Sequence, residues 1–503
     1  MTRAPARGPA GEPHAAAGAR AVPCLAVRRV AQALVALLLV AACAGPAVSR
    51  QAPRVDGAFE EWSDPLQVRA DARWIYLRFT LPERVTLQNA PYVVRVLIDA
   101  DGDAATGRRF ADTPPGLGPE VFVSFSSPNG SRRGRGARVR LVTPDGDEFP
   151  AAAAFGIVVA PTTSSRIFEM RIARRLEGLP QWGELLDAGP IRVGVIAGNA
   201  ADRTAWRSPI VEFVPPTAAS PVAPRAVLPQ RPSDGLRVVS WNVLWGRPQA
   251  DPEPFARVLR ALAPDLILLQ EWDRGKDTDL QQWFDKHAEG RWHVLRGAGF
   301  GVALVSRTPL QRLGPSRLLR PRGAGPDANR PDEAIRLVAA RTQARLGSVA
   351  FASIHLRCCG YDGSREDDMR VAEVGAIRTA LLDAGFASGT GLRLVGGDLN
   401  LVGSMRPLDA LRRGLGPQGS DLRPADTRRL ADTADYTWRN PQSAFTPGRL
   451  DWIAWAGEGF ATASAFIFDS RALSPEVLRS SGVRAGDTDV SDHLPLVVDL
   501  RRD

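Results

Sequence analysis

Residues 392–400 read LRLVGGDLN, a mostly apolar run that ends in two glycines, Asp398 and Asn400. A short apolar run bounded by glycine is typical of a buried strand. The carboxylate and the amide therefore come where the strand stops. Polar side chains in this position predict a functional site at one edge of a sheet.

The same arrangement ends the two strands that we expect at the start of residues 236–503. LRVVSWN ends at Asn242, and PDLILLQE ends at Glu271, a carboxylate that suits a hard divalent cation. Between them, residues 252–262 have apolar residues at helical spacing behind Asp251, which predicts a capped helix. The alternation of strand, helix and strand predicts an α/β fold.

Further polar residues accompany the later strands. The strand expected over residues 348–354 is followed by His355, and Asp451 lies in the run LDWI. Asp492 and His493 come just before the last strand, LPLVVDL. Each motif is weak alone, but we expect the polar groups to converge on one sheet edge.

The ordered series WNV, QE, SRTP, HL, GGDLN, YTW, RLDW and SDHLP spans nearly all of residues 236–503 and resembles the endonuclease/exonuclease/phosphatase superfamily. The resemblance implies a four-layer αββα sandwich and metal-dependent cleavage of phosphoester bonds. It also implies Mg²⁺ as the usual cofactor, with Mn²⁺ or Ca²⁺ as alternatives. Such chemistry needs a cation for the developing charge, a base for water and an acid for the leaving oxygen.

The resemblance implies a role for most of these residues. Glu271 resembles the principal metal ligand, with Asn242 and Asp492 completing or orienting the coordination shell. His493 resembles the histidine beside the phosphate, and Asp451 the carboxylate that holds its imidazole in one tautomer.

Three more residues resemble positions that act on the phosphate. Asp398 and Asn400 resemble residues that position the nucleophile and the scissile phosphate, and whether His493 or Asp398 takes the proton stays open. His355 resembles a second histidine of the branch with pancreatic-type deoxyribonuclease, bacterial sphingomyelinase and inositol phosphatases. A nuclease or phosphodiesterase is expected, with a phospholipid or a small phosphoester as the alternative substrate. The non-enzymatic alternative is a surface glycan-binding protein with an inactive rear domain.

Residues 50–214 have a different pattern, in which short β-rich runs alternate with Gly, Pro and Asp turns. This pattern predicts an antiparallel β-sandwich. VDG at 55–57, EW at 61–62 and LIDADGD at 97–103 resemble family 9 carbohydrate-binding modules, which implies a glycan ligand. The proline-rich residues 215–235 predict a linker.

Two features of the predicted sandwich have open interpretations. Asp99, Asp101 and Asp103 alternate like the start of a calcium loop, but Phe110 occupies the position of the last EF-hand ligand. A carboxylate-capped turn and a cation site are both compatible with this pattern. Four tryptophans are candidates for a sugar-stacking platform or for the core: Trp62, Trp74, Trp182 and Trp206.

Residues 1–43 predict an export signal, because two arginines precede an apolar run at 30–42 that is too short to span a bilayer. VAAC at 40–43 resembles the lipobox of bacterial lipoproteins, which implies lipidation of Cys43 and an anchor in the cell envelope, at the outer membrane or on the periplasmic face. A plain secretory signal would leave the protein secreted. The true start codon stays open.

Composition limits the class of protein, the partners and the disulfides that can be expected. The 503 residues, 44% of them hydrophobic, indicate a soluble protein of several domains, and we expect a monomer. Part of the net charge of +9 comes from five arginines against one glutamate in residues 1–43, so charge alone identifies no partner. Beyond the leader only Cys358 and Cys359 are present, which excludes a disulfide-stapled scaffold and leaves a vicinal disulfide or two thiols.

Overall fold

The computed structural model describes most of the chain after residue 51. Contacts group Ala52–Asp503 into one compact unit. The leader, with Cys43, lies outside the described residues. These are 52–62, 65–126, 135–143, 145–176, 182, 186, 189–198, 206–216, 225–273, 275–297, 301–320 and 334–503.

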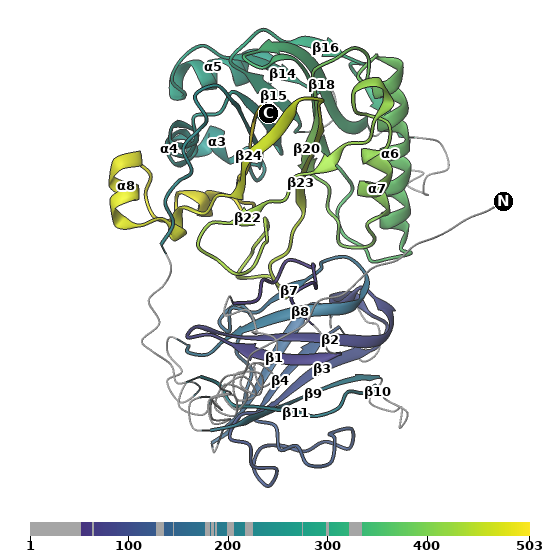
Figure 1. Cartoon of the computed structure of the whole chain (residues 1–503), viewed down its shortest axis with the longest axis vertical. Helices are drawn as coiled ribbons and strands as arrows, with labels where there is room; N and C mark the ends of the chain where they lie inside the picture. The colour runs from purple at the N-terminus through teal and green to yellow at the C-terminus, as the bar shows by residue number, and fades with distance from the viewer. Residues whose placement is uncertain are drawn as a thin grey trace, which may run out of the picture. The chain divides into compact units, whose positions relative to one another are not determined.

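Two antiparallel sheets form the predicted β-sandwich (Figure 1). Side chains alternate along the strands, so Val94, Val96 and Ile98 enter the core between the sheets whereas Leu97 faces away. One sheet has the order β1 (Leu66–Ala70), β2 (Trp74–Val85), β8 (Ser165–Ala173) and β7 (Val158–Ala160). The other has the order β10 (Trp206–Arg207), β9 (Ile191–Gly198), β3 (Val93–Asp99), β4 (Val121–Phe125), β5 (Ala137–Thr143) and β6 (Gly146–Glu148), with β11 (Val211–Phe213) beside β9.

Two further sheets lie in the C-terminal domain and pack against each other through apolar side chains such as Val238 and Phe351. The first has the order β14 (His293–Arg296), β15 (Ala303–Ser306), β13 (Leu266–Gln270), β12 (Leu236–Asn242), β25 (Leu496–Arg502), β24 (Phe460–Ile467) and β22 (Arg428–Arg429). The second has the order β16 (Gln311–Leu313), β18 (Ala334–Ala344), β19 (Gly347–His355), β20 (Leu392–Asp398), β23 (Asp451–Ala456) and β21 (Arg423–Pro424), with β17 (Leu318–Leu319) beside β18.

Helices cover the outer face of each sheet and complete the four layers (Figure 1). On the first sheet lie α3 (Arg247–Ala250), α4 (Pro252–Leu262) and α5 (Asp277–His287). On the second lie α6 (Arg365–Asp383) and α7 (Arg406–Arg412), and α8 (Pro475–Ser481) lies near the end of the chain. In β12, Val238 faces the inner core and Val239 faces α4, as the strand period requires. The α/β prediction, with an αββα domain behind an all-β sandwich, is confirmed.

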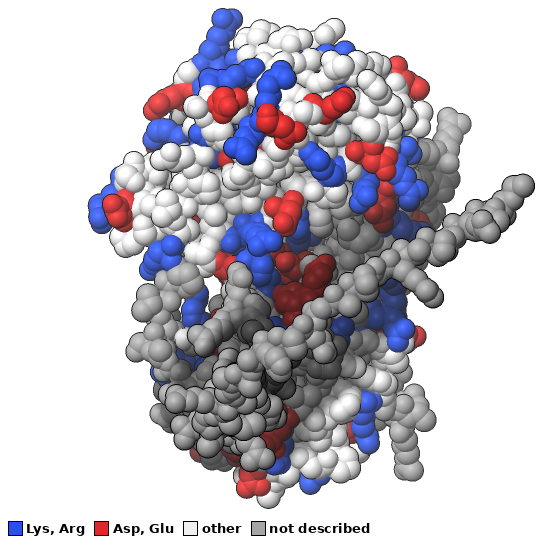
Figure 2. All heavy atoms as spheres, viewed as in Figure 1, with Lys and Arg blue, Asp and Glu red and all other residues white. Residues whose placement is uncertain are grey.

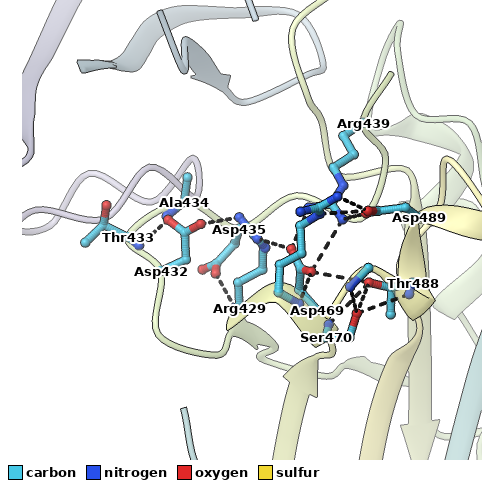
Figure 3. A network of polar contacts seen from close by, with 12 residues as sticks. Arg429, Asp432, Thr433, Ala434, Asp435, Arg439, Asp469, Ser470, Thr488 and Asp489 are labelled. Atoms are coloured by element: carbon cyan, nitrogen blue, oxygen red, sulfur yellow. Dashed lines mark hydrogen bonds and ion pairs between the residues drawn. The ribbon is translucent and has the colours of Figure 1, made fainter. Parts of the chain in front are cut away.

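Arginines and aspartates alternate where the sandwich meets the C-terminal domain (Figure 3). Arg171 of β8 pairs with Asp432, which also pairs with Arg429. Arg429 and Arg439 each donate to Asp469, at 2.7 and 2.5 Å. We call these residues the arginine–aspartate network. It joins the two domains through charged groups that satisfy one another.

Candidate active site

Strand direction brings the predicted polar residues to one edge of the C-terminal sheets. β12 runs parallel to β13, and β19 runs parallel to β20, so the carboxyl ends of each pair meet. The residues at these ends are Asn242, Glu271, His355 and Asp398. β23 starts at this edge, and its register places Asp451 opposite Asp398.

Glu271 follows β13 in the left-handed conformation, with φ of 59°. Non-glycine residues in this conformation store strain and cluster at functional sites. The Nδ2 of Asn242 donates to Oε1 at 3.1 Å, and the backbone N–H of Trp245 donates to Oε2 at 3.0 Å. The side chain is 16% exposed, so these contacts hold the carboxylate in a position that solvent can reach.

Asp398 ends β20 with both carboxylate oxygens held. Oδ1 accepts the backbone N–H of Asn400 at 2.9 Å, and Oδ2 accepts Nδ2 of Asn242 at 3.1 Å. Asn400 has a positive φ of 48°. A Cβ at Gly397 would lie 1.9 Å from the carbonyl oxygen of Ile354, so this position of the GGD motif has to be glycine.

His493 and Asp451 form the tightest pair of the site. Nδ1 of His493 lies 2.7 Å from Oδ2 of Asp451, and Nε2 lies 3.7 Å from Oδ2 of Asp398. Burial alone would lower the pKa of His493, but the charges of Asp451 and Asp398 raise it to about 10. The imidazole is therefore protonated at neutral pH.

His355 faces the same carboxylates from β19. Its Nε2 lies 3.4 Å from Oδ2 of Asp398 and 4.0 Å from Oε1 of Glu271. An Nη1 of Arg336 lies 3.0 Å from its Nδ1. Burial, followed by the charges of Arg336 and His493, lowers the pKa of His355 well below its ordinary value. The site therefore contains one charged and one neutral imidazole.

Asp398 lies between these two histidines. Burial raises its pKa, the charge of His493 lowers it, and the charge of Asp451 raises it again, which places the pKa at about 7. A carboxyl group with this pKa exchanges a proton near neutral pH, as a general base or acid must.

The donor set fits a divalent cation. Glu271, His355 and Asp398 each offer one ligand atom, and these atoms lie within 4.8 Å of one another. Two carboxylates are the ligands that hard cations such as Mg²⁺ prefer. Asn242 donates its N–H to both carboxylates, so in this arrangement it orients the ligands.

Asp492 lies outside that group of ligand atoms in the part of the chain that the structure describes. Its Oδ2 accepts Nε1 of Trp438 at 2.9 Å, and its charge helps to raise the pKa of the neighbouring His493. Direct metal binding by Asp492 stays a prediction. Trp438 belongs to the YTW motif, so that motif was a usable signal for this contact.

Sequence reasoning missed two residues that hold the site together. Ser491 donates to the carbonyl oxygen of Asn242 at 2.7 Å and accepts the backbone N–H of His493 at 3.1 Å. It lies in the SDH motif, which marked the position. Arg336 is opposite His355 in the β18–β19 register, and no pattern in the run AIRLVAARTQA singles it out.

The sandwich contains a second group of carboxylates. One oxygen each from Asp99, Asp101 and Glu120 lies within 4.8 Å of the others. Asp103, which the sequence pattern included, lies outside the group, and its Oδ1 accepts the backbone N–H of Ala105. Glu120 was missed because it lies beyond a long turn, next to β4.

The loop after β19 links the site to the sandwich. Nδ2 of Asn89 donates to the carbonyl oxygen of Gly360 at 3.2 Å. Cys358 and Cys359 are free, exposed thiols in this loop, which favours the thiol interpretation over a vicinal disulfide. The loop that follows His355 is thus held by a residue of the N-terminal domain.

The fold and the site together define a class: an αββα domain with a candidate cation site of carboxylates beside two histidines. The sequence of residues 239–493, half of the chain, matches the Endonuclease/Exonuclease/phosphatase family. The chain belongs to this family, whose members are divalent-metal-dependent phosphoesterases.

Solved structures with a similar domain have low sequence identity. A humanized D. rerio TDP2 is 15% identical, covering 54% of this chain and 100% of that protein, with a TM-score of 0.36. The human Nocturnin catalytic domain is 17% identical over 55% of this chain and 97% of its own, also with a TM-score of 0.36. Beta toxin from Staphylococcus aureus is 17% identical over 52% of this chain and 99% of its own, with a TM-score of 0.34. No curated protein matches in sequence.

Proposed function

We propose that this chain is an exported, metal-dependent phosphodiesterase, and that nucleic acid is its first candidate substrate. The observation that carries the proposal is the His493–Asp451 pair at 2.7 Å, next to the ligand group of Glu271, His355 and Asp398. This arrangement supplies positive charge, a titrating carboxylate and cation ligands within a few ångströms.

The proposed mechanism divides the work between the two histidines and Asp398. Asp398, with a pKa of about 7, takes the proton from the attacking water. His493, held protonated by Asp451, binds the phosphate oxygens and stabilises their developing charge. His355 is neutral and can donate an N–H to the leaving oxygen.

Glu271 would hold the cation, for which we propose Mg²⁺, with Mn²⁺ or Ca²⁺ as alternatives, and Asp398 and His355, which transfer protons in this mechanism, lie beside it. When bound, the cation supplies Lewis-acid stabilisation of the phosphoryl oxygens. Asn242 keeps the two carboxylates apart and oriented by donating to both. Asn400 fixes the Asp398 carboxylate from the other side through its backbone N–H.

Export and membrane attachment are proposed from the leader. The apolar run at 30–42 and the lipobox-like VAAC support lipidation of Cys43 and a place in the bacterial cell envelope. In the described residues, no helix has both the length and the hydropathy to span a bilayer. We further propose that the protein acts as a monomer.

Surface charge does not decide which phosphoester is the substrate. Figure 2 shows basic and acidic side chains interspersed on the visible face, an arrangement that does not select nucleic acid over other phosphoesters. Phospholipid head groups and small phosphoesters therefore stay as alternative substrates.

The first experiment is nicking of supercoiled plasmid by the full chain, with Mg²⁺, with Ca²⁺ and with chelator. We expect relaxed circle with Mg²⁺ and none with chelator. His493→Ala should abolish nicking, whereas His287→Ala in α5 should not, which excludes a contaminating nuclease. No nicking by a folded protein that still hydrolyses bis(p-nitrophenyl) phosphate or sphingomyelin vesicles would overturn the nuclease assignment but keep the phosphodiesterase. No hydrolysis of any of these substrates would overturn both.

A glycan ligand of the sandwich is a separate proposal. Trp62 and Trp182 are buried, and Arg171 lies 4.0 Å from the ring centre of Trp74. Trp206, which is partly exposed, is then the tryptophan that would contact a sugar. Loss of polysaccharide retention in Trp206→Ala would support this proposal, and the absence of retention in the unmodified chain would overturn it.

A further inference from the structure

Three carboxylates of the sandwich converge at the turn that joins β3 to β4. Asp99 is the last residue of β3, Asp101 follows two residues later, and Glu120 directly precedes β4. We call these three residues the β3–β4 acidic group. Asp99 and Glu120 are buried and Asp101 is half-buried, with one oxygen of each within 4.8 Å of the others.

No arginine or lysine pairs with this group among the residues that the structure describes. The chain is rich in arginine, with only two lysines among 64 basic residues. Other buried carboxylates form ion pairs with arginine, as in the Arg237–Asp499 pair at 2.7 Å and the Arg257–Asp487 pair at 2.7 Å. Buried carboxylates that face one another without a cation are costly. The group therefore lacks the compensation that the arginines of these pairs provide.

One oxygen in the group is both buried and unpartnered. The Asp99 side chain is fully buried, and its Oδ2 accepts the backbone N–H of Gly118 at 3.0 Å. Its Oδ1 has no hydrogen-bond partner among the residues that the structure describes. Such orphaned atoms are rare in native proteins and point to a bound ion or water.

The oxygens around Thr106 outnumber the available hydrogens. Oγ1 of Thr106 lies 3.1 and 2.9 Å from the two carboxylate oxygens of Asp101, 2.8 Å from the carbonyl oxygen of Asp103, and 3.2 Å from Oε1 of Glu120. A hydroxyl carries one hydrogen and can donate to one of these four acceptors at a time. Backbone N–H groups reach two of these oxygens, since Asp103 donates to Oδ1 of Asp101 at 2.8 Å and Thr106 donates to the carbonyl oxygen of Asp103 at 3.2 Å. The remaining lone pairs are available to a cation.

We propose that Asp99, Asp101 and Glu120 bind one calcium ion, with Thr106 Oγ1 and the carbonyl oxygen of Asp103 beside it. Ca²⁺ accepts six to eight oxygen ligands in irregular geometry, whereas Mg²⁺ requires a near-octahedral shell. A turn that supplies carboxylate, hydroxyl and carbonyl oxygens matches calcium. The ion ties the residues between β3 and β4 to the sheet.

The test is isothermal titration of CaCl₂ into the full chain carrying Glu271→Gln, which removes a main ligand of the candidate active site. We expect about one Ca²⁺ per chain, and a loss of affinity of about tenfold or more in Asp101→Asn and in Glu120→Gln, because each removes a ligand charge. Asp103→Asn is the matched control, since its carboxylate lies outside the group. It should bind within about twofold of the parent.

Three outcomes would overturn the proposal. The first is that the folded Glu271→Gln chain does not bind calcium. The second is that Asp101→Asn leaves the calcium affinity unchanged, and the third is that Asp103→Asn lowers it as much as Asp101→Asn does. Asp101 is half-buried, so Asp101→Asn keeps the test valid if Glu120→Gln fails to fold. None of these readouts uses phosphoesterase activity, so the result is independent of the proposed function.

Discussion

Buried aspartates serve opposite purposes in the arginine–aspartate network and in the candidate active site. In the network, Asp432 and Asp469 each pair with arginine, and the charges of Arg429 and its partners hold their pKa values below the ordinary range despite burial. In the site, Asp398 pairs with no arginine in the described part of the chain, and burial raises its pKa to about 7.

The presence or absence of an arginine partner distinguishes the aspartates that stabilise the fold from the one expected to act in catalysis. An arginine that pairs with a carboxylate keeps it ionised and links the two chain segments that carry the pair. The paired oxygens are then unavailable to other groups. Asp398 faces histidines and an amide, so its oxygens can exchange a proton or bind a cation. Acidic groups without an arginine partner among the described residues are therefore candidates for function in so arginine-rich a chain, and the β3–β4 acidic group is another such place.

The largest effect should come from Asp398→Asn. We expect hydrolysis to fall by about 10² to 10⁴, because a positioned base supplies this much rate. The melting temperature should change little, since no arginine loses a partner. Activity on plasmid or bis(p-nitrophenyl) phosphate, together with thermal unfolding, measures both. Asp426→Asn, whose side chain is 82% exposed, is the control, and equal activity of the two variants would contradict the role of Asp398.

Asp469→Asn should instead lower the stability of the fold. It removes the acceptor that the buried Arg429 and the half-buried Arg439 share, while Asp432 and Asp489 stay as their other partners, so we expect a loss of about 1 to 3 kcal/mol. Urea unfolding of this variant beside Asp426→Asn measures the loss. An unchanged free energy of unfolding would show that the network contributes nothing to stability and would break the comparison.

The stabilisation that the network provides should also decrease at low pH. The folded pKa values of Asp432 and Asp469 are depressed, so their stabilisation is present above the unfolded pKa of about 3.9 and is lost as pH falls through the folded values. The stability difference between the parent and Asp469→Asn should therefore be full at pH 6 and shrink below about pH 4. A difference that is constant from pH 6 to pH 3 would contradict this assignment.

The smallest effect should come from Trp438→Phe, which removes the donor to Asp492. A neutral donor of this kind contributes about 0.5 to 1.5 kcal/mol, or roughly 2- to 10-fold in kcat/KM. Trp206→Phe in the sandwich is the control. A loss of more than about 100-fold would instead place Asp492 among the groups that hold the cation or the phosphate.

Much of the site could be predicted because it lies where strands end. Asn242, Glu271, His355 and Asp398 each terminate an apolar run, and parallel pairing carries them to one edge. The positions of the missed contacts depended on register. Arg336 reaches His355 only because β18 and β19 pair as they do.

The sequence by itself predicted several strands, their order along the chain and the polar residues at their ends, because apolar periodicity and turn residues act locally. Only the tertiary structure decided which charges meet. Glu120 joins Asp99 across paired strands, and Arg171 of the sandwich reaches Asp432 in the C-terminal domain. Partners distant in the chain are selected by packing and by the cost of burying an unpaired charge, and neither leaves a local pattern in the sequence.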